Sequence, residues 1–362
     1  MKSIHYFIIL LLSFSSGSAQ QFTLETPLDI AVNETSGLLY LNNTLITHND
    51  SATTNQLFDV DTSTGAVTRT VTITNASNTD WEDLTHDGTY IYIGDFGNYE
   101  GDRTNLKVYR IAIADYFAST SVTADLIRFS YSNQTDFTSS PIATNFDAEG
   151  LIHYNNKLYV FSKNWLNGDT DIYELSKEPG IHSISIIDTI SAQGLISGAT
   201  YNPLDNSIIL IGYDVNGAFI IQLNGFNSGL FSNGTVVKTS MNVPNNYSFQ
   251  VEAIIPINVN EYYVSAEEYS SNASGLYSFN VSTLSITAYD DIAISFYPNP
   301  AKDVISLSHE DCETKIYAIT GQLVKTSSNK KIDISDLSTG IYLVKIQGKG
   351  NVNSTTKRLL IE

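Results

Sequence analysis

A stretch in the first third of the chain, residues 80–98, has a pattern that returns four more times in the sequence. It consists of an acidic start, a short strand, a polar turn at Asp87-Gly88, a second strand and a second polar end. An Asp-Gly pair between alternating apolar residues predicts a β-hairpin. Because the two strands of a hairpin run antiparallel, we expect its two polar ends to lie side by side.

The five copies of this pattern divide residues 22–290 into similar units. In each unit four apolar segments alternate with turn residues, and no long segment has a helical period. The motif positions are 48 to 67 residues apart and fall at Glu34, Glu82, Glu149, Ser197 and Glu252. Four strands per repeat, at a period somewhat above the ~40–45 residues of the commonest blade, are typical of a β-propeller. In the third unit, the fourth strand is expected at residues 183–187.

The sequence therefore predicts an all-β fold with a propeller of five blades. Six blades are the alternative, if residues 22–31 or the long step between the second and third motifs contain another blade. As a further alternative, residues 22–32 pair with the last blade and close the ring. Closure would remove the unpaired strand edges that an open blade leaves.

The start of the chain predicts export. Residues 1–19 have the form of a secretory signal peptide, with Lys2, an apolar run at residues 7–12, and Gly17-Ser18-Ala19 before the expected cleavage site. The apolar run is shorter than the roughly 20 residues that span a membrane. We expect no transmembrane segment in the mature chain.

Charge is distributed unevenly along the chain. Residues 21–294 contain 9 Lys and Arg against 31 Asp and Glu, whereas residues 295–362 contain 9 against 7. The acidic part would repel nucleic acid, which we exclude as a partner. The single cysteine, Cys312, excludes an intramolecular disulfide, so the domains must be stable through packing alone.

Residues 295–362 form a second domain in this interpretation. The segment Tyr297-Pro298-Asn299-Pro300 predicts a turn before a set of short strands, Gly340 marks a later turn, and Gly321 belongs to the same motif. Together with Ile316-Tyr317 and the closing Lys357-Arg-Leu-Leu-Ile361, this part resembles the type A sorting domain of proteins exported by the bacterial type IX secretion system. The resemblance implies a small β-sandwich that binds the type IX machinery, and a protein that is released or attached to the outer-membrane surface.

The candidate site lies at one mouth of the propeller channel. The inner strand of each blade begins at this mouth and the second strand returns to it, because the two are antiparallel. The expected ligands of a metal ion are Glu34, Glu82, Asn98, Glu149, Asn164 and Glu252. Further ligand-binding candidates are Asp80, Trp81, Asp95, Asp147 and Trp165. Carboxylate and amide oxygens suit Ca²⁺ or Mg²⁺ better than zinc, and Ca²⁺ is the cofactor that we expect.

Three roles for these residues remain open. Asp, Asn and Ser cap local backbone groups at strand ends, so the acidic residues could be structural. Alternatively they bind a metal ion or polar ligand, or they act in general acid-base catalysis. Carboxylates that converge on one mouth raise one another's pKa unless a cation or hydrogen-bond donors compensate.

The acidic strand starts also resemble those of gluconolactonase, paraoxonase and esterase-like phytase propellers. That resemblance implies a central calcium held by Glu34, Asn98, Glu149 and Asn164, acting on a lactone or phosphate ester. As a whole, residues 34–280 are more similar to uncharacterised secreted propellers with the same sorting domain. We therefore expect an extracellular binding module for an unidentified ligand, with a divalent-cation-dependent hydrolase of lactones, esters or phosphate esters as the alternative.

Overall fold

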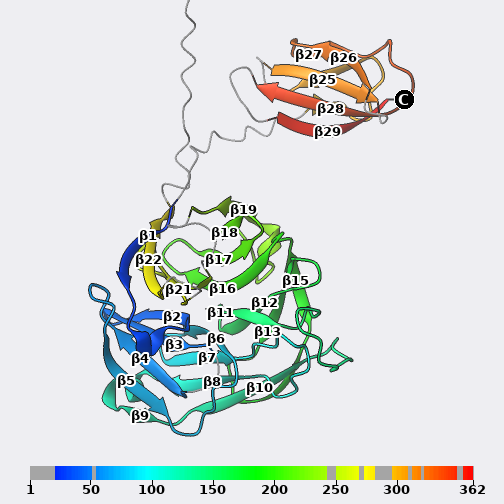
Figure 1. Cartoon of the computed structure of the whole chain (residues 1–362). Coiled ribbons are helices and arrows are strands. Elements are labelled where there is room, and N and C mark those ends of the chain that lie inside the picture. Colours follow the sequence, from blue (N-terminus) through cyan, green and yellow to red (C-terminus); the bar gives the residue numbers. More distant parts are fainter. Residues whose placement is uncertain are drawn as a thin grey trace, which may run out of the picture. The chain divides into compact units, whose positions relative to one another are not determined.

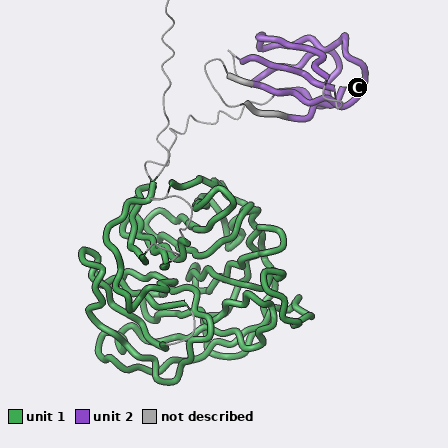
Figure 2. Tube along the Cα trace, viewed as in Figure 1, with its two compact units in different colours: residues 1–284 green, residues 285–362 purple. Residues whose placement is uncertain are grey.

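The computed structural model divides the chain into two compact units, residues 1–284 and 285–362 (Figures 1 and 2). It describes residues 21–50, 54–242, 250–268, 273–281, 296–308, 312–318, 322–348 and 354–361. The predicted signal peptide lies outside these residues. No helix in the described ranges is long and apolar enough to cross a membrane.

Five β-sheets form a ring in the first unit, which confirms the propeller (Figure 1). The inner strands are β2 (Thr35–Leu41), β6 (Trp81–His86), β11 (Ala148–Tyr154), β16 (Leu195–Asn202) and β20 (Val251–Pro256). The second strands are β3 (Thr44–Asn49), β7 (Tyr90–Asp95), β12 (Lys157–Ser162), β17 (Ser207–Asp214) and β21 (Glu261–Ala266). The third strands are β4 (Gln56–Val60), β8 (Lys107–Ala112), β13 (Thr170–Leu175), β18 (Gly217–Asn224) and β22 (Gly275–Asn280). Each inner strand contacts the inner strands of the two neighbouring blades, so the ring is closed.

The fourth strand of the last blade comes from the opposite end of the unit. Blades one to four use β5 (Val67–Ile73), β10 (Asp125–Tyr131), β15 (Ile186–Ile190) and β19 (Thr235–Ser240). In the fifth blade, β1 (Thr23–Pro27) pairs antiparallel with β22, with Thr23 opposite Ser278. The described residues thus form five blades, and the segment that could have held a sixth closes the ring instead.

Two short strands join a blade other than the one their position in the sequence suggests. Strand β9 (Ser121–Val122) follows α1 (Ile113–Ala118) and pairs in parallel with β5, and β14 (Gly180–Ile184) pairs in parallel with β10. The expected fourth strand of the third unit, residues 183–187, is therefore wrong in part. Residues 183 and 184 extend the second blade, and the third blade uses β15. Short 3-10 turns occur at η1 (Ile30–Val32) and η2 (Phe231–Asn233).

The propeller core lies between adjacent blades. Alternate residues of each strand point to opposite faces of its sheet, and both faces are covered by a neighbour. One apolar cluster, for example, joins Ile152 and Phe161 of the third blade to Ile208, Leu210 and other residues of the fourth. The stacking holds the inner strands at fixed positions around the channel.

The second unit is a β-sandwich, as predicted. One sheet contains β23 (Phe296–Tyr297), β24 (Val304–Leu307) and β27 (Lys331–Asp333). The other contains β26 (Leu323–Ser327), β25 (Cys312–Ala318), β28 (Gly340–Gly348) and β29 (Ser354–Ile361). Apolar residues of both sheets, among them Ile305, Ile316 and Leu359, form one core.

The predicted sorting motif forms a turn against the last strand of the sandwich. The bonds before Pro298 and Pro300 are both cis. Asn299 Nδ2 donates to the carbonyl oxygen of Arg358 (2.8 Å), and its Oδ1 accepts from the amide of Leu360 (2.9 Å). Gly340 has φ +157° at the start of β28. Gly321 lies outside the described residues.

Candidate functional site

Every inner strand contains a β-bulge near its start. The register with the second strand shifts by one residue between Thr35 and Leu38, and an equivalent shift occurs in β6, β11, β16 and β20. A bulge inserts one extra residue, which redirects side chains locally. The bulge residues are Ser36, Glu82, Glu149, Ser197 and Glu252. Four of the five predicted motif positions are thus equivalent in the structure.

The register predicted for Glu34 is wrong. Glu34 lies before β2, and Ser36 occupies the position equivalent to Glu82. The Ser36 hydroxyl donates to the carbonyl oxygen of the bulge residue Glu82 in the next blade (2.7 Å), and the Ser197 hydroxyl donates to the carbonyl oxygen of Val251, one residue before the bulge residue of the next blade (2.6 Å). The bulge side chain is therefore a structural cap in two blades and a carboxylate in the other three.

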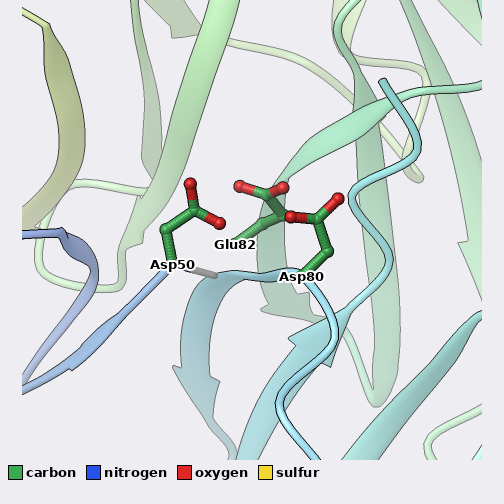
Figure 3. A group of neighbouring side chains, drawn as sticks. All are labelled: Asp50, Asp80 and Glu82. Carbon is green, nitrogen blue, oxygen red and sulfur yellow. The ribbon is translucent and has the colours of Figure 1, made fainter. Parts of the chain in front are cut away.

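The carboxylates of those three blades meet others at the strand ends. Glu82, Glu149 and Glu252 are each 5 to 6% exposed. One carboxylate oxygen from each of Asp50, Asp80 and Glu82 lies within 4.8 Å of the other two, and these three side chains point toward one another (Figure 3). Glu82, Asp147 and Glu149 form a second group at the same spacing. Glu82 belongs to both groups and therefore joins them.

We name this end of the channel the acidic mouth. Its carboxyl groups are Asp50, Asp80, Glu82, Asp147, Glu149, Glu252 and Glu267. Two cations face them. Lys163 Nζ lies 2.9 Å from Glu149 Oε1, and Arg103 lies 4.0 Å from Asp80 while it binds Asp95 at 2.6 Å. Carboxyl groups thus greatly outnumber these two cations.

Burial and mutual repulsion raise the pKa values of the acidic mouth. Burial is the largest cause, and it raises the pKa of Asp80 to about 6 and that of Glu149 to about 7, even though Lys163 opposes the rise at Glu149. Burial and neighbouring carboxylates also raise the pKa of Asp50 and of Glu82 well above the ordinary range. Asp50 Oδ1 is buried and accepts no hydrogen bond from an amide or a basic side chain among the described residues, and the Asp50 carboxyl group has a hydrogen bond with that of Asp80.

These shifts predict that the metal-free propeller loses stability as the pH rises from about 5 to about 8. The folded pKa values near 6 and 7 exceed the unfolded values of 3.8 and 4.5, so the folded state binds more protons in this window. Other groups act in the opposite direction. Burial lowers the pKa of His48 to about 4, which opposes the loss up to about pH 6.5, and local hydrogen bonds lower the pKa of Asp61 to about 2, which acts below the window. The raised carboxyl groups of the acidic mouth outnumber His48, and above pH 6.5 they act without this opposition. Thermal denaturation in chelator at a series of pH values measures the effect. A melting temperature that increases steadily to pH 8 would contradict it.

Several predicted ligands have their polar atoms committed elsewhere. Asn98 donates through Nδ2 to Phe146 O and accepts from the Arg103 amide, at 3.0 and 2.9 Å. Asn164 accepts from Ser162 Oγ (2.6 Å) and donates to Asp171 Oδ2 (3.0 Å). Both amides stabilise loops in this way, so the structure offers no reason to count them as metal ligands.

The two tryptophans differ. Trp81 is fully buried between His48 and Tyr109, so the expectation that it binds a ligand is wrong. Trp165 is partly exposed, and its Nε1 donates to Asp147 Oδ2 (2.8 Å). The ammonium of Lys163 lies 5.1 Å from the centre of the Trp165 ring. Trp165 therefore remains a ligand-contact candidate at the acidic mouth.

Asp95, by contrast, is not available to bind a ligand at the acidic mouth. Its side chain is 0% exposed and forms ion pairs with Arg103 (2.6 Å) and Lys107 (2.7 Å). Its charge is compensated locally, which makes it a structural residue that holds Arg103 beside Asp80. Sequence reasoning missed this role of Arg103.

Asp83 is a central residue that sequence reasoning did not identify. It follows Glu82 in the bulge of β6 and is 1% exposed. Its carboxylate accepts amide hydrogen bonds from Leu84 (2.8 Å), Leu151 (2.8 Å) and Ala199 (3.3 Å), which belong to three blades. Burial raises its pKa while these bonds oppose the rise.

The other blades leave room for Asp83. The equivalent residues are Gly37, Gly150, Gly198 and Ala253. A Cβ on Gly198 would lie 2.4 Å from the carbonyl oxygen of Glu252, and one on Gly150 would lie 2.8 Å from the Cβ of Ala199. A single carboxylate thus occupies the centre, surrounded by small residues. The consecutive acidic pair at residues 82 and 83 was the signal in the sequence.

Comparison with known proteins identifies the C-terminal domain. Residues 295–362 match the family model of the secretion system C-terminal sorting domain. This result confirms the resemblance stated above and indicates export by the type IX secretion system to the cell surface or extracellular space. The search of curated protein sequences found no match.

Among solved structures, similar chains have low identity. PorZ, a surface component of the type IX secretion system of Porphyromonas gingivalis, is 14% identical (TM-score 0.31; 91% of this chain and 45% of that chain covered). The periplasmic gluconolactonase of Pseudomonas aeruginosa is 11% identical (TM-score 0.37; 90% and 88% covered). A putative 6-phosphogluconolactonase from Bacteroides uniformis is 10% identical (TM-score 0.36; 93% and 88% covered). This chain thus spans about half the length of the PorZ chain.

Proposed function

We propose that the propeller is an extracellular binding module that holds a divalent cation, Ca²⁺, at the acidic mouth and uses it to bind a ligand. One observation carries this proposal. One oxygen from each of Asp50, Asp80 and Glu82 lies within 4.8 Å of the other two, and no amide or basic side chain in the described part of the chain donates to the buried Asp50 Oδ1. The Asp50 carboxyl group has a hydrogen bond with the Asp80 carboxyl group, which requires a proton that a cation would replace. Once that proton is lost, a buried carboxylate oxygen without a donor is costly unless a partner binds it.

The donor atoms suit a hard cation. Carboxylate oxygens favour Ca²⁺, which takes roughly six to eight oxygen ligands, whereas zinc prefers nitrogen and sulfur. A bound cation would compensate the repulsion that raises the pKa values of Asp50 and Glu82. Asp147 and Glu149 lie close enough to Glu82 to support the same site.

Calcium binding should be measurable through stability. A ligand at 100 times its dissociation constant stabilises the fold by roughly 2.7 kcal/mol. We expect Glu82→Gln to abolish this gain, because Glu82 joins both carboxylate groups, and to leave the metal-free protein equally or more stable. Calorimetric melting with calcium and with chelator tests both statements.

The matched control for this experiment is Glu174→Gln. Glu174 is 40% exposed and pairs with Lys157 at the surface, so this variant should keep the full response to calcium. Two results would contradict the proposal: a wild-type melting curve that is the same in calcium and in chelator, or a Glu82→Gln variant that still responds. A large loss of metal-free stability in Glu82→Gln would show that this side chain is a structural cap.

The alternative, a hydrolase of lactones, esters or phosphate esters, is favoured by one residue. Glu149 has a pKa raised to about 7, close to the value at which a general acid or base works best. Against this, His48 is fully buried and accepts from the amide of Gly37, so it supplies no base at the mouth. Calcium-dependent turnover of generic ester and lactone substrates, lost in Glu149→Gln, would establish the hydrolase.

A further inference from the structure

Lys163 lies at the acidic mouth in a position where two other blades carry a carboxylate. It follows the second strand of the third blade, and its backbone amide donates to the carbonyl oxygen of Asp147 (2.8 Å), two residues before the bulge residue. The first, second and fifth blades make the same backbone bond through Asp50, Phe96 and Glu267. This position of the repeat is therefore acidic in the first and fifth blades and basic in the third.

The Lys163 ammonium faces several carboxyl groups at once. Its Nζ lies 2.9 Å from Glu149 Oε1, and the residue is only 6% exposed. Burial raises the pKa values of Asp147, Glu252 and Glu267, and the charge of this ammonium is the strongest influence in the opposite direction. The ammonium thus compensates charge on the side of the mouth that the third and fifth blades form.

Aromatic rings complete the surroundings of the ammonium. The ring centre of Trp165 lies 5.1 Å from Lys163 Nζ, and that of Tyr213, in the fourth blade, lies 5.4 Å from it. The face of an aromatic ring attracts a cation at such distances. Burial alone would lower the pKa of Lys163, yet its neighbours, Glu149 foremost, raise it well above the usual range. These groups therefore form a binding site for a positive charge, and a side chain of the protein itself fills it.

The acidic mouth has two groups of three carboxylates with the spacing of metal ligands, and the groups have one residue in common. In the group that contains Asp50, the contact with a cation is long, because Arg103 lies 4.0 Å from Asp80. In the group that contains Glu149, Lys163 is at hydrogen-bond distance. A metal ion in this second group would meet a positive charge that is already bound, whereas the first group is open to one.

We propose that Lys163 is a built-in cation that occupies the second cation position of the acidic mouth, the group that contains Glu149. It thereby limits the propeller to one divalent cation, bound by the group that contains Asp50. This inference rests on the proposed function, because it states how many ions that site takes and on which side. Lys163 is a positioning residue, which directs Ca²⁺ to the first and second blades.

The first test is the number of calcium ions per chain, measured by calorimetric titration of the full chain. We expect one ion in the wild type. Lys163→Met keeps an apolar stem and removes the charge, so it should bind two. Lys163→Arg keeps the charge and should bind one. The matched control is Lys157→Met, which should also bind one, because Lys157 begins the strand that Lys163 follows and pairs with Glu174 at the surface.

The second test needs no calcium. Lys163→Ala removes the part of the side chain that corresponds to n-propylammonium, so this ion should fill the space and restore the charge. In chelator, we expect n-propylammonium to raise the melting temperature of Lys163→Ala and to leave that of the wild type unchanged. The neutral alcohol n-propanol has a similar size and should stabilise neither protein. A side chain that served only to fill space would be replaced equally well by the alcohol.

The outcomes separate this inference from the proposed function. If the wild type and Lys163→Met both bind one ion, or if the wild type binds two, the inference is overturned and the proposed function stands. If the wild type binds no calcium, the proposed function fails, and the response to n-propylammonium decides the role of Lys163 alone. Equal effects of n-propylammonium and n-propanol on Lys163→Ala also overturn the inference. If one of the two neutral variants does not fold, the other decides.

Discussion

Replacing Asp83 with alanine is expected to lower the free energy of unfolding by roughly 3 kcal/mol, because a buried hydrogen-bond donor without a partner costs about 1–3 kcal/mol. The substitution leaves the amides of Leu84, Leu151 and Ala199 without their acceptor. Relief of the buried charge offsets part of this cost. Since the amides come from three blades, the loss affects the packing of the inner ring as a whole.

Chemical denaturation measures this loss. Asp83→Asn should fall between the wild type and the alanine variant, because its side-chain oxygen still accepts while its amide group cannot. Asp102→Ala is the control at an exposed loop residue, where the expected change is within about 0.5 kcal/mol. If Asp83→Ala is as stable as the control, the central carboxylate does not hold the blades together. If the alanine variant cannot be purified folded, Asp83→Asn alone decides.

Deleting residues 295–362 is expected to reduce the exported protein to background and to leave the propeller in the periplasm. These residues match the sorting domain, so the translocation signal is lost. The propeller should still fold, because its cores and its closing strand lie within residues 1–284. Immunoblots of medium and periplasm, together with a melting curve of the purified truncated protein, measure both effects.

A fusion controls for indirect effects of the deletion. Residues 295–362 attached to an unrelated periplasmic reporter should carry that reporter out of the cell. Export of the truncated chain at the wild-type level would show that the propeller carries its own signal. A truncated chain that is degraded rather than folded would show that the sandwich is needed for folding.

The repeats predicted the ring well because each repeat contains the consecutive strands that pair to form one blade, so the number of repeats gives the number of blades. The predicted register at Glu34 was wrong because the repeats were aligned on their acidic residues. They should have been aligned on the apolar residue that comes two positions after the bulge residue. Alignment on Leu38, Leu84 and Leu151 places Ser36 opposite Glu82 and Glu149. The same alignment reveals Asp83 at a position that is otherwise Gly or Ala.

Other features depend on contacts that no repeat encodes. Asn98 and Asn164 match the pattern of metal ligands in the sequence, yet in the structure their side-chain amide groups form hydrogen bonds with neighbouring residues of the protein. Strand β14 joins the preceding blade through parallel pairing that its own sequence does not indicate. A cavity of about 560 Å³ lies among the last residues of the five inner strands, because the side chains there do not fill the channel. Such a void results from packing and has no sequence motif.

The antiparallel pairing of β1 with β22 limits the order in which the propeller can fold. The paired residues Thr23 and Ser278 lie at opposite ends of the unit, so this contact has a very high contact order and a large loop-closure entropy. A chain that emerges N-terminus first holds β1 without a partner until the fifth blade is complete. During that time β1 is an unpaired edge that could associate with other chains. Chaperone protection in the periplasm would therefore matter most in the interval before the ring closes.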